Sequence, residues 1–381
     1  MDYRRRWQQT RLRKARKRLL WGLAVCLVAL LALAPFWLRG RSGLAWSLAP
    51  QQPGLVHFGT DGEELVAVWS TGQVAILDAD TGQPLAQSRL QSVFPLLSEP
   101  VVFQGRAVLG SDDGRVRELN LATGEVAWET VTGGAVRARP ARVGDLVLVG
   151  SDDGYLYCLQ EGTGQVRWRV HCGGKIGAEA APCTPSRVAV GTVGGGIVGV
   201  GGGGALTSSQ AETSGEARAT VQWRVPTEAP VLCPTVAFAE GRLVALGTDE
   251  GLFYLLEAAT GKVQSRTEFT GLLRCRPVAL PDRVVATDCA GQVMAFGLEG
   301  STLWSRRVRG PITAGLAASE EAVYLGTARG EILALRLSDG RQVWRRRLPA
   351  PAAGSLHLTA DLVVVGLSDG RVCALRRPPR G

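Results

Sequence analysis

The sequence predicts an all-β fold, an eight-bladed β-propeller of four-stranded blades, preceded by one N-terminal transmembrane helix. A glycine in a hairpin-like turn recurs about every 40 residues. A second glycine turn follows in most copies, and a tryptophan often stands four residues beyond it. Past residue 38, no segment shows the apolar period of an amphipathic helix, which indicates short strands within each repeat. A period of this length with several strands is typical of a propeller blade.

Residues 1–18 form a basic tail with nine Lys and Arg residues and one acid, Asp2. The whole chain carries a net charge of +9, so the tail accounts for almost all of it. The remaining residues therefore lack the broad positive field that nucleic-acid binding uses. The sequence predicts a cytoplasmic tail and no nucleic-acid partner.

Residues 19–38 form a stretch of twenty residues without a charge. As a helix, this stretch would span about 30 Å, the hydrocarbon thickness of one bilayer. The basic tail before it predicts a cytoplasmic N-terminus. We therefore expect a single-pass anchor in a bacterial inner membrane, with the propeller on the periplasmic or extracytoplasmic side. Two alternatives stay open: a secretory signal cleaved at Ala32-Leu33-Ala34, and a lipoprotein signal acylated at Cys26.

The repeat is clearest in residues 150–168. Asp153-Gly154 lies between two strand-like runs, which is a hairpin signal. Thr163-Gly164 marks the second turn, and Trp168 follows four residues after it. Around this unit we expect strands at residues 136–143, 146–150, 155–160 and 165–170. The first-turn glycine recurs at spacings of 39 to 42 residues, and once at 55, at Gly72, Gly114, Gly154, Gly196, Gly251, Gly291, Gly330 and Gly370.

The repeat tryptophan is expected to pack between blades, as a structural residue, at Trp46, Trp128, Trp168, Trp223, Trp304 and Trp344. The last hairpin, around Gly370, has no Trp-bearing strand after it, whereas residues 44–48 resemble such a strand without a hairpin before it. We expect residues 44–48 to complete the eighth blade, which would close the ring and remove exposed strand edges. The propeller would then extend over residues 39–377, followed by a C-terminal tail at 378–381.

The fourth copy carries an insertion, residues 199–220, that is rich in Gly, Ser, Ala and Glu. This composition favours a flexible loop, because it buries too little apolar surface to offset the entropy of ordering. A partner-binding loop is the alternative. A phosphate-binding loop is not expected, since no Gly-Lys-Ser/Thr sequence follows and no helix begins there.

The sequence shows no catalytic or metal-binding motif. His57, His171 and His357 lie far apart, and no cysteines are spaced as Cys-x-x-Cys, so we predict no metal ligands, no cofactor-binding residues and no catalytic residues. Cys275 and Cys289 flank one turn almost symmetrically, which would place them opposite each other on paired strands. They are expected either to form a disulfide or to remain free as small buried side chains.

Two arginine pairs recur where the chain crosses from one blade into the next, at Arg137, Arg139, Arg274 and Arg276. Guanidinium groups near the central channel could clamp an anionic group or an acidic peptide, which makes this rim the candidate partner-binding site. The alternative is that the arginines neutralise the acidic turns beside them.

The pattern of Asp-Gly-x-apolar-x-x-Leu, then Thr-Gly, then Trp four residues later, resembles the pyrroloquinoline-quinone-like (PQQ-like) propeller repeat. The resemblance extends over about residues 44–375. Two kinds of protein carry this repeat. Quinoprotein alcohol and sugar dehydrogenases hold a quinone and a calcium ion on it, and the propeller lipoprotein of the outer-membrane β-barrel assembly machinery uses eight such blades without a cofactor.

The chain resembles the assembly factor more than the dehydrogenases. Those enzymes have long insertions between blades, an adjacent Cys-Cys disulfide and Asn/Glu calcium ligands, whereas this chain has short turns and one asparagine, Asn120. The resemblance therefore implies a non-catalytic scaffold for protein-protein interaction outside the cytoplasm, with envelope or outer-membrane protein assembly as its setting and assembly components as its partners. A PQQ-dependent quinoprotein dehydrogenase is the alternative. The predicted anchor differs from the lipid anchor of the assembly factor.

Overall fold

The computed structural model describes residues 43–50, 54–60, 64–90, 98–202 and 219–378. The chain divides into two units, residues 1–45 and 46–381, and the second contains nearly all of the described strands. The basic tail, the predicted anchor and residues 379–381 lie outside the described residues. Among the residues that the structure describes, no helix is long and apolar enough to cross a membrane.

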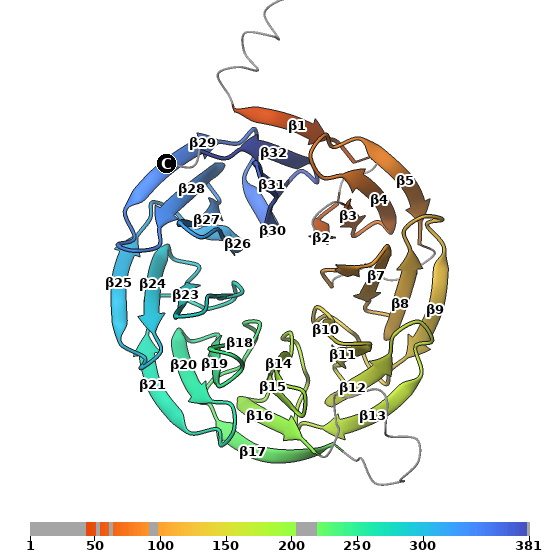
Figure 1. Ribbon diagram of the computed structural model, residues 1–381, viewed down its shortest axis with the longest axis vertical. Coiled ribbons are helices and arrows are strands. Elements are labelled where there is room, and N and C mark those ends of the chain that lie inside the picture. Colours follow the sequence, from red (N-terminus) through yellow and green to blue (C-terminus); the bar gives the residue numbers. More distant parts are fainter. Residues whose placement is uncertain (1–42, 51–53, 61–63, 91–97, 203–218, 379–381) are drawn as a thin grey trace, which may run out of the picture. The chain divides into compact units, whose positions relative to one another are not determined.

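The described residues form sheets of consecutive antiparallel strands (Figure 1). Six of these sheets have four strands and one has eight. The four-stranded sheets consist of β2 (Val56–Thr60), β3 (Glu64–Trp69), β4 (Gln73–Asp78) and β5 (Pro84–Arg89); β6 (Val101–Phe103), β7 (Arg106–Gly110), β8 (Arg115–Asn120) and β9 (Val126–Val131); β10 (Ala141–Val143), β11 (Leu146–Gly150), β12 (Tyr155–Gln160) and β13 (Val166–His171); β14 (Ala181–Thr184), β15 (Arg187–Thr192), β16 (Gly196–Gly201) and β17 (Thr220–Pro226); β18 (Val236–Phe238), β19 (Leu243–Gly247), β20 (Leu252–Glu257) and β21 (Val263–Glu268); and β22 (Val278–Ala279), β23 (Arg283–Thr287), β24 (Gln292–Gly297) and β25 (Thr302–Arg307).

The eight-stranded sheet contains β26 (Ile312–Ala318), β27 (Ala322–Thr327), β28 (Glu331–Arg336), β29 (Gln342–Arg347), β30 (Ala352–Leu358), β31 (Leu362–Leu367), β32 (Val372–Arg376) and β1 (Leu44–Leu48). It consists of two antiparallel sets that meet at one parallel pair, Ala314 of β26 and Gly354 of β30. In the strand order, β1 stands at the edge beside β32. In Figure 1, the sheets of residues 46–381 surround a common axis, and the last strand of each four-stranded sheet is its outermost strand. This arrangement is a β-propeller.

The strands of the third sheet lie close to their predicted positions. Strands β11 and β12 coincide with the predicted ranges 146–150 and 155–160, and β13 begins one residue later than predicted. The innermost strand, β10, begins at Ala141 instead of residue 136. Val136 instead donates its N–H to the Ser111 carbonyl oxygen beside the preceding sheet, so residues 136–140 belong to the crossing between two sheets.

The middle strands of each sheet are buried on both faces. All five residues of β11 are buried. Val147 and Val149 of β11 form one cluster with Val108 of β7 and Trp128 of β9, which belong to the neighbouring sheet. The hydrophobic core is therefore a series of layers between sheets, which is why the middle strands are continuous apolar runs in the sequence.

The turn glycine of the fourth repeat is Gly195, and the prediction of Gly196 is wrong. Gly154, in the third repeat, donates its N–H to the Ser151 carbonyl and has a φ of +86°. Gly195 makes the equivalent bond to Thr192 and has a φ of +84°, whereas Gly196 begins β16. Glycine adopts this left-handed conformation at little cost. The other seven predicted turn glycines all have positive φ.

The insertion in the fourth repeat is shorter than residues 199–220. Strand β16 continues to Gly201, and Gly199 pairs with Trp223 of β17. A Cβ atom on Gly199 would collide with the Trp223 indole, so glycine leaves space for the ring. Residues 199–201 and Thr220, which were predicted to belong to the loop, are therefore part of strands β16 and β17. Residues 203–218 lie outside the described residues.

The repeat tryptophans join successive sheets. In three repeats, the indole ring lies against the second-turn glycine of the next sheet. The pairs are Trp128 with Gly164, Trp223 with Gly261, and Trp304 with Gly340. Trp46 lies in the same way against Gly82. Trp46 of β1 therefore takes the place of the repeat tryptophan for strands β30, β31 and β32. Trp304 also donates its indole N–H to the Leu337 carbonyl oxygen at 2.8 Å.

Candidate binding surface at the central channel

Two of the predicted rim arginines, Arg137 and Arg274, are neutralised by acidic turns. Arg137 Nε lies 2.9 Å from Asp112 Oδ1, and the same guanidinium also pairs with Asp152. Arg274 donates two hydrogen bonds to the Asp249 carboxylate, at 2.6 and 2.9 Å. These bonds hold the pKa of Asp249 below its usual range. Both cations therefore have carboxylate partners within the rim itself, and the rim carries little excess charge at these positions.

The other two, Arg139 and Arg276, meet at Glu179. Arg139 Nη1 lies 3.1 Å from Glu179 Oε1, and Arg276 Nη1 lies 2.9 Å from Glu179 Oε2. Arg139 Nε is also 3.4 Å from Glu99 Oε1. Glu179 is buried, and burial raises the pKa of its carboxyl, although Arg276 and Arg139 both favour the ionised form. The structure thus joins two of the four predicted arginines through a carboxylate that the sequence analysis did not single out.

The charged residues of this cluster share one position in the repeat. Each stands two residues before the innermost strand of its sheet, before β6, β10, β14 and β22, and they are Glu99, Arg139, Glu179 and Arg276. Acids and arginines alternate along this series, so each carboxylate has a guanidinium within reach. The alternation is visible in the sequence, because Glu99, Arg139 and Arg276 each stand 15 residues before the turn glycine of their repeat, and Glu179 stands 16 before Gly195.

The cluster lines a cavity of about 530 Å³ at the inner strands, where His357 completes the polar wall. His357 Nε2 lies 3.0 Å from the Phe58 carbonyl oxygen and 3.6 Å from Glu99 Oε1. His57 lies on β2, where burial lowers its pKa and Glu99 opposes that change. The third histidine, His171, packs on Tyr155 instead, with ring centroids 5.0 Å apart. The cavity therefore presents a polar wall whose charges are already paired.

A model of the family described as outer membrane protein assembly factor BamB matches residues 39–181, 70–221 and 208–377. The chain belongs to this family. The predicted resemblance to the PQQ-like repeat and to the assembly-machinery propeller is therefore confirmed. No curated protein matches the chain.

Three solved structures share the fold of this BamB-family chain. BamB from Moraxella catarrhalis has 17% identity and a TM-score of 0.69, over 88% of this chain and 99% of that one. The computationally designed Ika8 protein has 18% identity and a TM-score of 0.73, over 88% and 99%. Quinohemoprotein alcohol dehydrogenase from Comamonas testosteroni has 14% identity and a TM-score of 0.67, over 89% and 77%. At these identities, the likeness establishes the fold.

The inner cavity does not fit the quinone and calcium group of the dehydrogenases. Calcium takes roughly six to eight oxygen ligands, several of them from carboxylates. The two carboxylates of this cavity, Glu99 and Glu179, are engaged by arginines. Within the described ranges, no three His, Cys, Asp or Glu residues converge as a metal site would require. These residues therefore give no support to a cofactor-dependent reaction.

Cys275 and Cys289 lie together as free thiols that share a hydrogen bond. This bond lowers the pKa of Cys289 to about 7, and the neighbouring Arg274 cation favours the thiolate further. The same bond and burial raise the pKa of Cys275. Cys233 packs beside the pair, with its Sγ 3.2 Å from the Cys275 carbonyl oxygen, and burial raises its pKa to about 12. The sequence left a disulfide and free thiols as alternatives for Cys275 and Cys289, and in the structure both are free thiols.

We predict that Cys289 is the first of these thiols to react with iodoacetamide at pH 7. A pKa of about 7 makes roughly half of its thiol the reactive thiolate at that pH, whereas Cys158, Cys172, Cys183 and Cys233 have pKa values raised to about 11 or 12 by burial. Mass spectrometry of digested protein would give the alkylation rate at each cysteine between pH 5 and 10.

Two variants test the cause. Cys275→Ala removes the hydrogen-bond donor and should shift the pH midpoint of Cys289 alkylation upward, while Cys275→Ser keeps a donor and should shift it less. A midpoint near the usual thiol pKa in the wild type would contradict the prediction.

Proposed function

We propose that this BamB-family chain is a non-catalytic, membrane-anchored, eight-bladed scaffold that binds protein partners outside the cytoplasm, in envelope or outer-membrane protein assembly. The observation that carries the proposal is the family match, which runs from residue 39 to residue 377. Six four-stranded sheets and the two antiparallel sets of the eight-stranded sheet support a count of eight blades. The paired charges of the inner cavity are consistent with a surface for polypeptide rather than a reaction centre.

The proposed location follows from the first 38 residues. An uncharged stretch of twenty residues after a strongly basic tail favours a single-pass anchor with its N-terminus in the cytoplasm. The propeller would then face the periplasm of a bacterial inner membrane, where envelope assembly components are the expected partners.

Cross-linking in native membranes tests the proposed function directly. The full chain should cross-link to envelope proteins that engage in assembly, and the cross-linked positions should lie on the propeller. Cross-links only to cytoplasmic proteins, or none at all under conditions where a known membrane complex cross-links, would contradict it.

A titration with the quinone and calcium tests the enzyme alternative. We expect neither the absorbance spectrum nor the melting temperature of the purified full chain to change, because the inner cavity holds its carboxylates in ion pairs with Arg139 and Arg276. Saturable binding with a rise in melting temperature would favour a quinoprotein dehydrogenase instead.

A further inference from the structure

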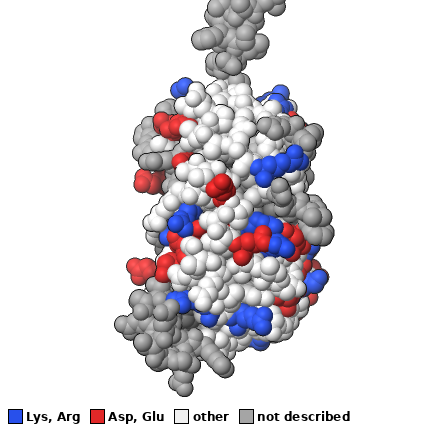
Figure 2. All heavy atoms as spheres, turned by 90° about the vertical axis from the view of Figure 1, so that its right-hand side faces the viewer, with Lys and Arg blue, Asp and Glu red and all other residues white. Residues whose placement is uncertain are grey.

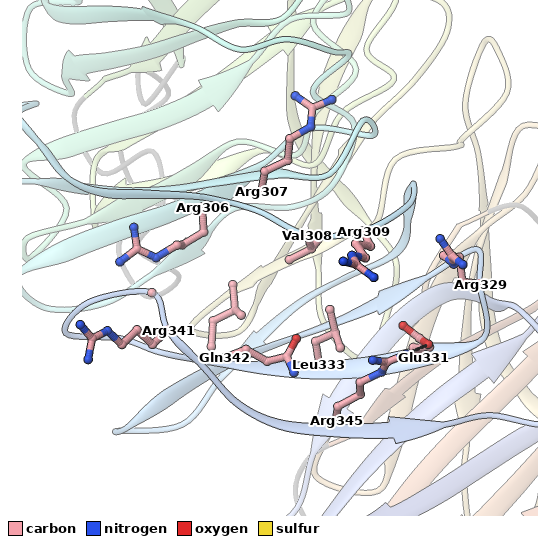
Figure 3. Close-up of a pocket in the computed structure, with 12 residues that line it drawn as sticks. Arg306, Arg307, Val308, Arg309, Arg329, Glu331, Leu333, Arg341, Gln342 and Arg345 are labelled. Carbon is pink, nitrogen blue, oxygen red and sulfur yellow. Dashed lines mark hydrogen bonds and ion pairs between the residues drawn. The ribbon is translucent and has the colours of Figure 1, made fainter.

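A groove lined by arginines lies between the outer strand β25 and the β28–β29 hairpin (Figure 3). We call it the arginine groove. Its volume is about 470 Å³. Its basic lining residues are Arg306, Arg307, Arg309, Arg329, Arg341 and Arg345. Val308, Leu333 and Leu335 form the apolar part of its wall, and Glu331 is its one acidic lining residue.

The fold gathers these arginines from three separate segments. Arg306 and Arg307 end β25, and Arg309 follows in the crossing to β26. Arg329 precedes β28, and its side chain runs over Gly310, where a Cβ would lie 2.8 Å from Arg329 Cδ. In Figure 3, Arg306 of β25 lies on one wall of the groove, and Leu333 of β28 and Gln342 of β29 lie on the other. The Arg307 side chain points away from β28 and β29. Long arginine stems can cover apolar surface while their charged heads stay in water.

Most of the groove arginines form no ion pair within the part of the chain that the structure describes. Arg345 pairs with Glu331, and Arg341 Nε lies 3.5 Å from Asp339 Oδ2. Four other groove arginines form no ion pair with any acid among the described residues; they are Arg306, Arg307, Arg309 and Arg329. Among the described residues, Arg306 and Arg307 hydrogen-bond neutral oxygens, of Ser305 and Thr270. Arg306 is nevertheless close enough to Asp339 to help lower the pKa of that carboxyl. All four are exposed.

Two other surfaces of the propeller differ from the groove, because their arginines have carboxylate partners. Figure 2 shows the side at the right of Figure 1, where basic and acidic residues lie next to each other. On β8, for example, Arg117 pairs with both Asp113 and Glu129. The rim arginines Arg137 and Arg274 are likewise neutralised. Like charges held close together repel one another, so an anionic ligand in the arginine groove would relieve a repulsion that these other surfaces do not have.

We propose that the arginine groove binds an extended acidic segment of a partner protein. The inference rests on the proposed function, since it names the kind of partner that the scaffold holds. Carboxylates at alternate positions of an extended chain point to the same side. These carboxylates would pair in turn with Arg306, Arg309 and Arg329. The intervening side chains would pack on Val308 and the arginine stems. A groove with two walls suits a chain of this kind better than the flat surface of a membrane.

The binding test uses the purified full chain in an uncharged detergent. The probe is a fluorescent peptide of about eight residues that alternates Glu and Leu, a length of roughly 26 Å when extended. A matched peptide with Gln in place of Glu is the control probe. Fluorescence anisotropy should show saturable binding of the Glu peptide that weakens as salt is added, and little binding of the Gln peptide.

Matched charge variants locate the site. Arg309→Ser with Arg329→Ser removes two groove cations and should weaken peptide binding at least about tenfold, because each charge-assisted bond contributes more than a neutral one. Arg346→Ser with Arg347→Ser removes two cations from the same β29 strand outside the lining and should change binding less than about twofold. Both variants should melt like the wild type, since the four arginines are exposed.

The remaining outcomes separate this inference from the proposed function. Equal weakening by both double variants, or no binding of the Glu peptide, would overturn the groove as a specific site. Competition by vesicles of anionic lipid, but not by acidic peptide, would assign the groove to a membrane surface instead. If the groove variant still cross-links to its partners in native membranes as the wild type does, the groove inference fails while the scaffold function stands.

Discussion

Deleting residues 44–48 should lower the free energy of unfolding of the propeller by at least about 5 kcal/mol. The deletion removes Trp46 and Leu48, which pack against the cluster formed by β2, β3, β4, β31 and β32. It also removes the contact between Ser47 Oγ and Cys373 Sγ, at 3.2 Å, and exposes the edge of β32. Far-ultraviolet circular dichroism during heating would report the loss as a lower melting temperature.

A deletion of the same length elsewhere is the control. Removing residues 206–210 shortens the insertion for which the sequence predicts a flexible loop, and it should leave the melting temperature nearly unchanged. If both deletions melt alike, β1 does not hold the ring closed. A second variant, Trp46→Ala, should reproduce part of the loss, because its ring lies against Gly82.

Local signals in the sequence predicted most of the fold. An Asp-Gly turn, a Thr-Gly turn and a tryptophan at a fixed distance are properties of adjacent residues, and they placed β11 and β12 correctly. The turn glycine of the fourth repeat was missed, since Gly194, Gly195 and Gly196 are consecutive and only the backbone conformation distinguishes them. The late start of β10 was also missed, since Val136 continues the apolar pattern but its N–H bonds the Ser111 carbonyl oxygen in the crossing between sheets.

The candidate sites were harder to predict because they depend on contacts between distant segments. The sequence drew attention to Arg139 and Arg276, but their shared partner Glu179 comes from a third sheet. The arginine groove escaped notice for another reason. The net charge outside the basic tail is close to zero, because acids elsewhere cancel the arginines of β25 and β29 in the sum. The groove can be recognised only from where each arginine lies in space, and those positions follow from the fold.

Replacing Trp304 with alanine should lower the free energy of unfolding by about 3–5 kcal/mol, the usual cost of truncating a buried aromatic side chain. Trp304 is only 6% exposed. Its ring lies against Gly340 of the next sheet, and its indole N–H donates to the Leu337 carbonyl oxygen at 2.8 Å. Truncation would therefore leave both a cavity between two sheets and a carbonyl without its donor. Urea unfolding followed by circular dichroism would measure the change.

The repeat supplies its own control for Trp304. Ser265 occupies the same position in β21: it pairs with Leu255 of β20 as Trp304 pairs with Ala295 of β24, and it lies against Gly300 as Trp304 lies against Gly340. Ser265→Ala should therefore cost less than about 1 kcal/mol, because little volume is lost. Trp304→Phe should fall between the two, since it keeps a ring but loses the N–H donor. Equal costs for Trp304→Ala and Ser265→Ala would mean that the repeat tryptophan does not join the sheets.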